Sequence, residues 1–283
     1  MTIQAPWTGE ALLLPLCAMC LFFFATMGLF AVRCAAIGRP RTPYIESRQV
    51  APIWKWWMEW WVWLWGPVER ACVALGVTPS AITVASTVLT GGASALLGLG
   101  YLAAGGWAYL FAASLDLVDG RVARAQGTTS RAGAFLDSTL DRVAELLVFA
   151  GLAVHFRASA TLYAALAAAG ASVVVSYARA RGEALGAGAE AKVGGMQRAE
   201  RVVLTGLPCA VAPLFDAAFG PGAGDTAAGS ALALLGGATT LTAARRGHAI
   251  WRALRDHEPQ PARPAANVRW LESARRRQQR LGR

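Results

Sequence analysis

Long apolar runs separated by short polar connections are the dominant pattern of this chain. A helix that crosses a bilayer needs about 20 mainly apolar residues, and residues 11–32 form such a run without a charged side chain. Six further runs of suitable length lie at residues 80–103, 106–126, 132–155, 159–181, 202–220 and 227–247. The pattern predicts an all-α integral membrane protein in which a six-helix transmembrane core follows one N-terminal transmembrane helix.

A shorter segment has a different pattern. Residues 54–65 read W-K-W-W-M-E-W-W-V-W-L-W and contain seven of the eleven tryptophans of the chain. Tryptophan prefers the boundary between membrane and water, where its ring is buried and its N–H group stays hydrated. We therefore expect residues 52–75 to form an amphipathic helix that lies in the membrane interface. An anchor to the lipid is its simplest role, and guidance of a lipid substrate is the alternative.

The positive charges mark one side of the membrane. Basic residues follow the first apolar run and recur in every second connection of the core, and residues 245–283 hold eleven arginines against three acids. In the remaining connections of the core, Arg157 is the only basic residue. Because cytoplasmic loops carry the excess of Lys and Arg, we expect the N-terminus outside and the C-terminus in the cytoplasm. Residues 1–10 contain no Lys or Arg, which favours a retained anchor over a cleaved signal.

Composition supports the membrane interpretation. Of the 283 residues, 55% are hydrophobic and 16% are charged, whereas soluble domains carry about 25% charged residues. Basic residues exceed acidic ones by 10, a balance that suits either nucleic acid or an anionic membrane surface. The apolar runs favour the membrane and argue against nucleic acid. The five cysteines are odd in number and mostly lie in apolar runs, so they are interpreted as packing residues rather than disulfide partners.

These segments divide the chain into four parts. An N-terminal transmembrane anchor with a basic loop occupies residues 1–45, and the Trp-rich interfacial helix occupies residues 46–76. The transmembrane core spans residues 77–255, and a basic cytoplasmic tail spans residues 256–283. The expected location is a multi-pass position in the inner or plasma membrane of the cell.

Four carboxylates lie within two neighbouring apolar runs of the core. Asp116 and Asp119 are three residues apart, and Asp137 and Asp141 are four apart, so each pair shares one helix face. A short connection makes the two helices antiparallel neighbours, which places both pairs near their cytoplasmic ends. Converging carboxylates need a positive partner, and oxygen ligands select hard cations such as Mg²⁺, Mn²⁺ or Ca²⁺. The alternative is ion pairing with arginines nearby in the sequence, namely Arg121, Arg124 and Arg142.

The spacing of these acids is specific. Residues 116–141 read D-x2-D-G-x2-A-R-x8-G-x3-D-x3-D, which fixes eight residues over 26 positions. This pattern resembles the signature of the CDP-alcohol phosphatidyltransferases in every fixed position and gap. The layout of six spans, with the signature across the second and third, is similar as well. The resemblance covers residues 67–255.

The resemblance implies transfer of a phosphatidyl group from CDP-diacylglycerol to an alcohol with release of CMP, supported by two Mg²⁺ or Mn²⁺ ions. By analogy, Asp116, Asp119 and Asp137 bind one ion, and Asp116, Asp137 and Asp141 bind the other. Asp141 also accepts the proton of the attacking hydroxyl. The positions that match contacts to the CDP-lipid are Thr78, Pro79, Ser80, Ala81, Gly120, Ala123, Arg124, Ser130 and Gly133.

Three arginines from separate segments suggest the acceptor. Arg179, Arg201 and Arg246 lie in the basic connections of the core, and guanidinium groups suit a phosphorylated alcohol better than a neutral one. The segments resemble the phosphatidylinositol phosphate synthase branch of the family, in which such residues bind the acceptor phosphate. Arg179 departs from the Lys that is frequent at its position. The alternative interpretation is that these arginines only reflect the excess of positive charge in cytoplasmic loops.

Other functions stay open at this point. Glycerol 3-phosphate is the second acceptor, as in a phosphatidylglycerophosphate synthase. A divalent-cation carrier is the alternative from another class, but it predicts acids distributed along a path, whereas these acids form one cluster. The expected partners are the two substrates and membrane lipids, and the family resemblance is compatible with a homodimer.

Overall fold

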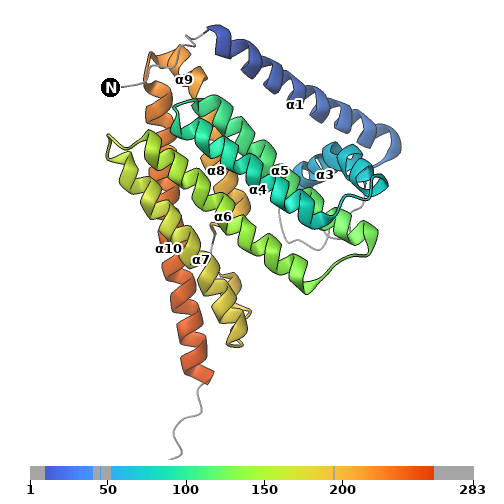
Figure 1. The fold of residues 1–283 in the computed structure, drawn as a ribbon, viewed down its shortest axis with the longest axis vertical. Coiled ribbons are helices and arrows are strands. Elements are labelled where there is room, and N and C mark those ends of the chain that lie inside the picture. The colour runs from blue at the N-terminus through green and yellow to red at the C-terminus, as the bar shows by residue number, and fades with distance from the viewer. Residues whose placement is uncertain (1–9, 41–44, 46–51, 194, 258–283) are drawn as a thin grey trace, which may run out of the picture. The chain divides into compact units, whose positions relative to one another are not determined.

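The computed structural model describes residues 10–40, 45, 52–193 and 195–257. This part of the chain is helical and contains no strand (Figure 1). Its elements are α1 (Glu10–Ile37), α3 (Pro52–Ala74), α4 (Pro79–Gly98), α5 (Leu102–Gln126), α6 (Arg131–His155), α7 (Thr161–Ala184), the 3₁₀ turn η1 (Glu190–Lys192), α8 (Arg198–Ala210), α9 (Ala212–Phe219) and α10 (Ala223–His257).

Four of these helices are long and apolar enough to cross a membrane, which confirms an all-α integral membrane protein. The apolar stretches are Cys17–Ile37, Pro79–Gly98, Thr161–Ala184 and Ala223–Asp256. Helices α5 and α6 form where two further spans are predicted, but they are not among the four. Each of them carries at least four charged residues, and their span assignment stays a prediction.

The predicted span over residues 202–220 is divided. Helices α8 and α9 meet at Val211 with a bend of 43°. Pro208 lies inside α8 and Pro213 lies in the first turn of α9. Proline lacks a backbone N–H and blocks the helix path before it, so the sequence itself interrupts this segment. Together the two helices are apolar enough for a fifth span.

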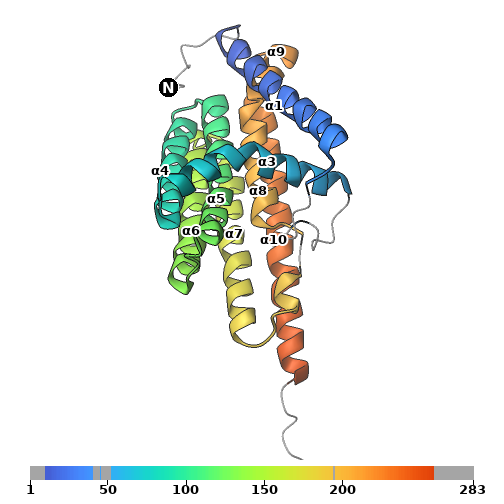
Figure 2. The ribbon, with the colours of Figure 1, turned by 90° about the vertical axis from the view of Figure 1, so that its right-hand side faces the viewer.

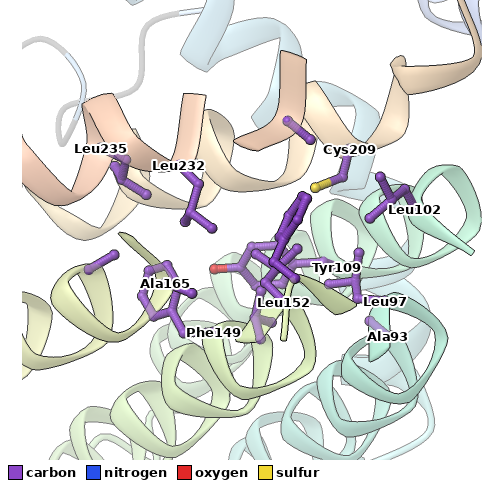
Figure 3. Packing of buried hydrophobic residues seen from close by; sticks show 14 of the residues in the cluster. Ala93, Leu97, Leu102, Tyr109, Phe149, Leu152, Ala165, Cys209, Leu232 and Leu235 are labelled. Atoms are coloured by element: carbon purple, nitrogen blue, oxygen red, sulfur yellow. The ribbon is translucent and has the colours of Figure 1, made fainter. Parts of the chain in front are cut away.

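The described chain separates into two compact units. Of the described residues, those before 175 and those from 195 to 241 form the first unit, and residues 175–193 and 242–257 form the second. The main hydrophobic core belongs to the first unit and is built from α4, α5, α6, α8 and parts of α7 and α10. Figure 3 shows Tyr109 of α5 among Leu97, Phe149 and Leu152. The second unit has a smaller core around Ala187, Ala191 and Ile250.

Glycines set the close approach of α5 to α8 and of α6 to α4. A Cβ on Gly106 of α5 would lie 2.7 Å from the carbonyl oxygen of Gly206 on α8. A Cβ on Gly151 of α6 would lie 2.8 Å from Ser94 Oγ on α4. Side chains at these positions would separate the helices, because real Cβ contacts are longer. The glycines therefore hold α8 against α5, and α6 against α4.

The Trp-rich segment forms one helix, α3, as predicted, and it crosses α5 rather than running along it (Figure 2). Its tryptophans differ from the prediction that their N–H groups stay hydrated. Trp60 is 0% exposed, and the Nε1 atoms of Trp60 and Trp65 are buried without a hydrogen-bond partner in the described chain. The reason is aromatic packing: Phe23 of α1 contacts Trp60 and Trp61 at centroid distances of 5.8 and 5.9 Å. These tryptophans attach α1 to α3.

The cysteines are free, as expected. Cys209 is buried in the main core and the other four are partly or fully exposed. Among the described residues, the only group of three or more metal-ligating side chains is acidic. A packing role is therefore seen for Cys209, and for the other four cysteines it stays a prediction.

Candidate active site

The site begins with two helix starts. The Thr78 side chain accepts a hydrogen bond from the backbone N–H of Ala81 at 3.4 Å and caps α4, with Pro79 as the first helical residue. Ser130 accepts from the N–H of Gly133 at 3.0 Å and caps α6. Both caps belong to the predicted CDP-lipid contacts. Free N–H groups and the helix dipole at such ends favour anions.

The carboxylates of the signature converge between α5 and α6. One oxygen each of Asp116, Asp119 and Asp137 lies within 4.8 Å of the others. Asp119 is buried and accepts a hydrogen bond of 2.6 Å from Thr83 Oγ1 on α4. It also accepts from the backbone N–H of Gly120. Three helices therefore position the cluster, and Thr83 is a contributor that the sequence did not single out.

Arg198, the first residue of α8, reaches the same cluster. Its guanidinium donates a hydrogen bond to Asp116 Oδ2, and its Nη2 lies 2.8 Å from Asp141 Oδ1. Arg142 is 3.7 Å from Asp141 Oδ2. Of the ion pairs proposed as the alternative, only that of Arg142 forms with these acids, because Arg121 pairs with Glu69 instead. The sequence showed Arg198 only as one charge of a basic connection.

The residues present fit a divalent cation. Four carboxylates face two guanidinium groups, so negative charge remains in excess. Asp141 Oδ1 is buried without a hydrogen bond in the described chain, although Arg198 Nη2 is near. This carboxylate oxygen and the three converging ones are a donor set for Mg²⁺ or Mn²⁺. The group of three contains the acids predicted for the first ion. Asp141 lies outside that group, so its ligand role stays a prediction.

The remaining CDP-lipid candidates lie beside the acids. Arg124 is exposed, and its Nη1 atom would be 3.4 Å from a Cβ on Gly120. Because Gly120 has no side chain, the guanidinium has room to lie over α5 at Gly120, the residue after Asp119. Ala123 is half-buried, and Gly127, with φ 67°, ends α5 in the left-handed conformation. This turn leads directly into the Ser130 cap.

The three predicted acceptor arginines have different surroundings. Arg201 is 2% exposed; its Nη2 donates to Glu145 Oε2 at 3.0 Å and its Nη1 donates to the Met196 carbonyl at 2.9 Å. Arg246 is 4% exposed and donates to the carbonyls of Val193 and Val175. Arg179 is exposed and pairs with Glu183 at 3.1 Å. Arg201 belongs to the first unit and the other two to the second, so a shared pocket stays a prediction.

The all-helical membrane fold and the spacing of the acid cluster are those expected of a class of lipid-synthesising transferases. Comparison with known proteins indicates the same class. The sequence pattern of the CDP-alcohol phosphatidyltransferase family matches residues 76–240, more than half of the chain. The chain belongs to this family and is an enzyme of this class. Helices α1 and α3 precede the matched region.

Its relatives include proteins named phosphatidylinositol phosphate synthase from Mycobacterium and Mycobacteroides. The protein of Mycobacterium tuberculosis (strain ATCC 25618 / H37Rv) is 35% identical over 192 residues, which cover 65% of this chain and 84% of the relative. The protein of Mycobacteroides abscessus is 34% identical over 189 residues, covering 65% and 82%.

Solved structures of the Mycobacterium tuberculosis phosphatidylinositol phosphate synthase share the fold. The structure with CDP-DAG bound has a TM-score of 0.57 and 30% identity, and covers 65% of this chain and 92% of that one. The structure in complex with manganese and citrate has a TM-score of 0.59 and 29% identity, and covers 70% and 95%.

Proposed function

We propose that this enzyme transfers the phosphatidyl group of CDP-diacylglycerol to the hydroxyl of a phosphorylated alcohol, with inositol phosphate as the expected acceptor, and releases CMP. The observation that carries the proposal is the convergence of Asp116, Asp119 and Asp137 within 4.8 Å. Relatives named phosphatidylinositol phosphate synthase support the choice of acceptor. Glycerol 3-phosphate is the second candidate.

Two divalent ions belong to the proposed site. Asp116, Asp119 and Asp137 would hold one ion, and Asp116, Asp137 and Asp141 the other. Bound Mg²⁺ or Mn²⁺ supplies positive charge that stabilises the diphosphate and the departing CMP. The relative solved with manganese supports this metal class.

The protein's own groups perform the remaining tasks. The capped starts of α4 and α6 offer backbone N–H groups to the diphosphate, and Arg124 offers a guanidinium beside Gly120. Thr83 holds Asp119 in one orientation through its hydroxyl. Asp141 accepts the proton of the attacking hydroxyl late, as the new P–O bond forms and the bond from phosphorus to the CMP oxygen breaks, because a carboxylate is a weak base. The leaving group is CMP, and no redox change occurs.

Arg198 has a separate task in this proposal. Its guanidinium pairs with Asp116 and Asp141, both of which are proposed ligands. It neutralises part of the cluster while no cation is bound, and it must release at least one of these carboxylates when ions bind. Arg198 therefore sets how readily the site takes up metal.

The acceptor is proposed to approach from the cytoplasmic side of the cell membrane. The basic connections favour this orientation, and they contain the proposed phosphate ligands Arg179, Arg201 and Arg246. Arg201 carries the pair with Glu145 in the buried interior of the first unit. Its proposed role therefore requires that the acceptor phosphate add to, or replace, that carboxylate.

The test is CMP release by the purified protein in detergent micelles. CMP should form only with CDP-diacylglycerol, Mg²⁺ or Mn²⁺ and an acceptor together, and faster with inositol phosphate than with glycerol 3-phosphate, free inositol or serine. Asp137→Asn serves as the inactive control. Faster CMP release with glycerol 3-phosphate would make that compound the acceptor. Equal rates of CMP release with free inositol and with inositol phosphate would contradict the phosphate pocket. Flux of divalent ions into proteoliposomes without CMP release would support a carrier instead.

A further inference from the structure

A second charged site lies in the N-terminal part of the first unit. A cavity of about 160 Å³ opens between α1, α3 and α5. It is lined by Arg33, Pro40, Glu59, Val62, Trp63, Gly66, Arg70 and Arg121. Three of these residues are arginines and one is an acid. All of them except Arg121 precede residue 76, where the match to the family begins, so this arginine cavity belongs largely to the part of the chain that is additional to the family core.

The acids around the cavity are already paired. Glu59 is buried and pairs with Arg39. Arg121 pairs with Glu69 and donates to the Val62 carbonyl at 2.9 Å. Each acid thus neutralises one guanidinium group. Arg33 and Arg70 have no carboxylate partner among the described residues, and the lining keeps a positive charge.

Arg33 and Arg70 both line the cavity. Arg33 Nη1 is buried and makes no hydrogen bond there. Arg70 is exposed, and its Nη1 lies beside Gly66, 3.4 Å from the place of a Cβ. Buried polar groups are almost always hydrogen-bonded, and paired guanidinium groups bind phosphate in a fixed geometry. A phosphate group in the cavity would accept hydrogen bonds from both guanidinium groups.

The size and the position of the cavity limit the kind of ligand that it can bind. Sites for small molecules usually measure about 300 Å³ or more, so a cavity of about 160 Å³ holds a phosphate group but not a nucleotide. Arg33 is the first charged residue after the apolar run 11–32. That run exposes large side chains on α1, including Leu21, Phe24 and Val32. If α1 spans the membrane with these side chains in contact with lipid, Arg33 at the end of the apolar run lies at the level of the headgroups.

We propose that the arginine cavity binds a phosphate group, supplied by the headgroup of an anionic membrane phospholipid. The phosphate accepts hydrogen bonds from Arg33 and Arg70 and lies against Arg121. It thereby joins α1 and α3 to α5, the helix that carries Asp116 and Asp119. The site is separate from the acid cluster and does not depend on the identity of the acceptor alcohol. Free phosphate is the other possible source of the same chemistry.

The test titrates dioctanoyl phosphatidylglycerol into the full-length protein in neutral detergent micelles, with EDTA present so that the acid cluster holds no cation and repels anions. Binding is followed by microscale thermophoresis. Dioctanoyl phosphatidylcholine is the zwitterionic control, and inorganic phosphate is the lipid-free arm. The variants are Arg33→Gln and Arg70→Gln, with Arg157→Gln as the matched control, because Arg157 is an exposed arginine in a different connection.

Each of the two substitutions should weaken phosphatidylglycerol binding about 10-fold or more, since a charge-assisted hydrogen bond is lost, while Arg157→Gln should bind like the wild type. Gly66→Leu is a second variant that removes no charge and fills the cavity; it should also weaken binding. Mn²⁺ binding without EDTA checks that each variant is folded.

Stronger binding of phosphatidylglycerol than of inorganic phosphate supports the lipid headgroup as the source. Equal binding of inorganic phosphate, lost in the same variants, assigns the site to free phosphate. The proposal is overturned if phosphatidylcholine binds equally well, or if the folded variants bind phosphatidylglycerol as tightly as Arg157→Gln.

Discussion

Two charged regions of opposite sign share helix α5. The acid cluster uses Asp116 and Asp119, and the arginine cavity uses Arg121. With about 100° per residue in a helix, Asp119 and Arg121 project about 200° apart. One helix therefore presents carboxylates to α6 and a guanidinium to α3. The first region is defined by residues close together in the sequence, whereas the second combines positions from 33 to 121.

The acid cluster and the arginine cavity differ in the structural features that each needs in order to form. The acids of the cluster are brought together mainly by helical spacing and one short turn, which are local rules, although Thr83 of α4 and Arg198 of α8 contact them from distant positions. The arginine cavity needs α1 and α3 to dock on the core, and Phe23 of α1 contacts Trp107 of α5 while Trp65 of α3 contacts Phe111 of α5. Its existence is a consequence of tertiary packing. Substitutions should therefore have severe and local effects in the first region and moderate effects in the second.

The largest effect is expected at the centre of the acid cluster. Asp137→Asn removes a charged ligand from both proposed ions. We expect the loss of several kcal/mol of transition-state stabilisation, which lowers the rate of CMP release by roughly 100-fold or more. CMP release by purified protein measures it. Ser138→Ala, one residue away and exposed, is the control and should stay active. Undiminished turnover in Asp137→Asn would remove the acid cluster from the mechanism.

The next effect concerns Arg201, whose two possible roles are separable. Arg201→Gln leaves Glu145 buried and unpaired, which costs about 3–5 kcal/mol of stability. If Arg201 also binds the acceptor phosphate, the acceptor KM rises about 10- to 100-fold while the KM for CDP-diacylglycerol changes little. Thermal unfolding and steady-state kinetics measure the two effects.

The double variant Arg201→Gln with Glu145→Gln distinguishes these roles. It removes both charges of the pair, so stability should return towards the wild type. A raised acceptor KM that persists in this variant assigns phosphate binding to Arg201. Recovery of both stability and acceptor KM would show that Arg201 is structural only.

Much of this architecture was predictable from the sequence. Residues 106–126 and 132–155 were predicted as helices, and α5 and α6 occupy Leu102–Gln126 and Arg131–His155. The acids fall on the facing sides because their spacing follows the helical period. Three of the four predicted metal ligands converge within 4.8 Å.

The rest depended on packing that the pattern does not encode. Arg198 reaches Asp116 from 82 positions further along the chain, because glycines at the α5–α8 contact let the helices approach. Glu145 lies one turn after Asp141 on the same helix, yet it serves as the partner of Arg201 and not as a member of the acid cluster. The hydrated tryptophans expected at the interface are partly buried, since α1 offers aromatic partners that a hydropathy pattern does not identify.

A smaller effect tests how α4 supports the acid cluster. Thr83→Val removes the hydroxyl that donates to Asp119 and keeps the volume and branching of the side chain. Loss of such a supporting hydrogen bond lowers metal affinity about 10- to 100-fold. Mn²⁺ titration followed by electron paramagnetic resonance measures the affinity. Thr83→Ser restores the hydroxyl and should recover most of it, whereas equal affinity in all three proteins would show that Asp119 needs no support.

The smallest effect is expected where α3 meets α5. Glu69 and Arg121 are each about 20% exposed at the side chain, so their coupling should be about 1 kcal/mol or less. A double-mutant cycle with Glu69→Gln and Arg121→Gln, read by thermal unfolding, measures it. A coupling of several kcal/mol would show that the arginine cavity is as rigidly specified as the acid cluster.

The central claim is that four carboxylates of α5 and α6 share two divalent ions. Counting Mn²⁺ bound per chain by electron paramagnetic resonance, in the presence of CDP-diacylglycerol, tests it most directly. The account predicts two ions in the wild-type protein and one in each of Asp119→Asn and Asp141→Asn, because each of these residues belongs to one ion's ligand set. A single ion in the wild-type protein, or two ions in both variants, would contradict it.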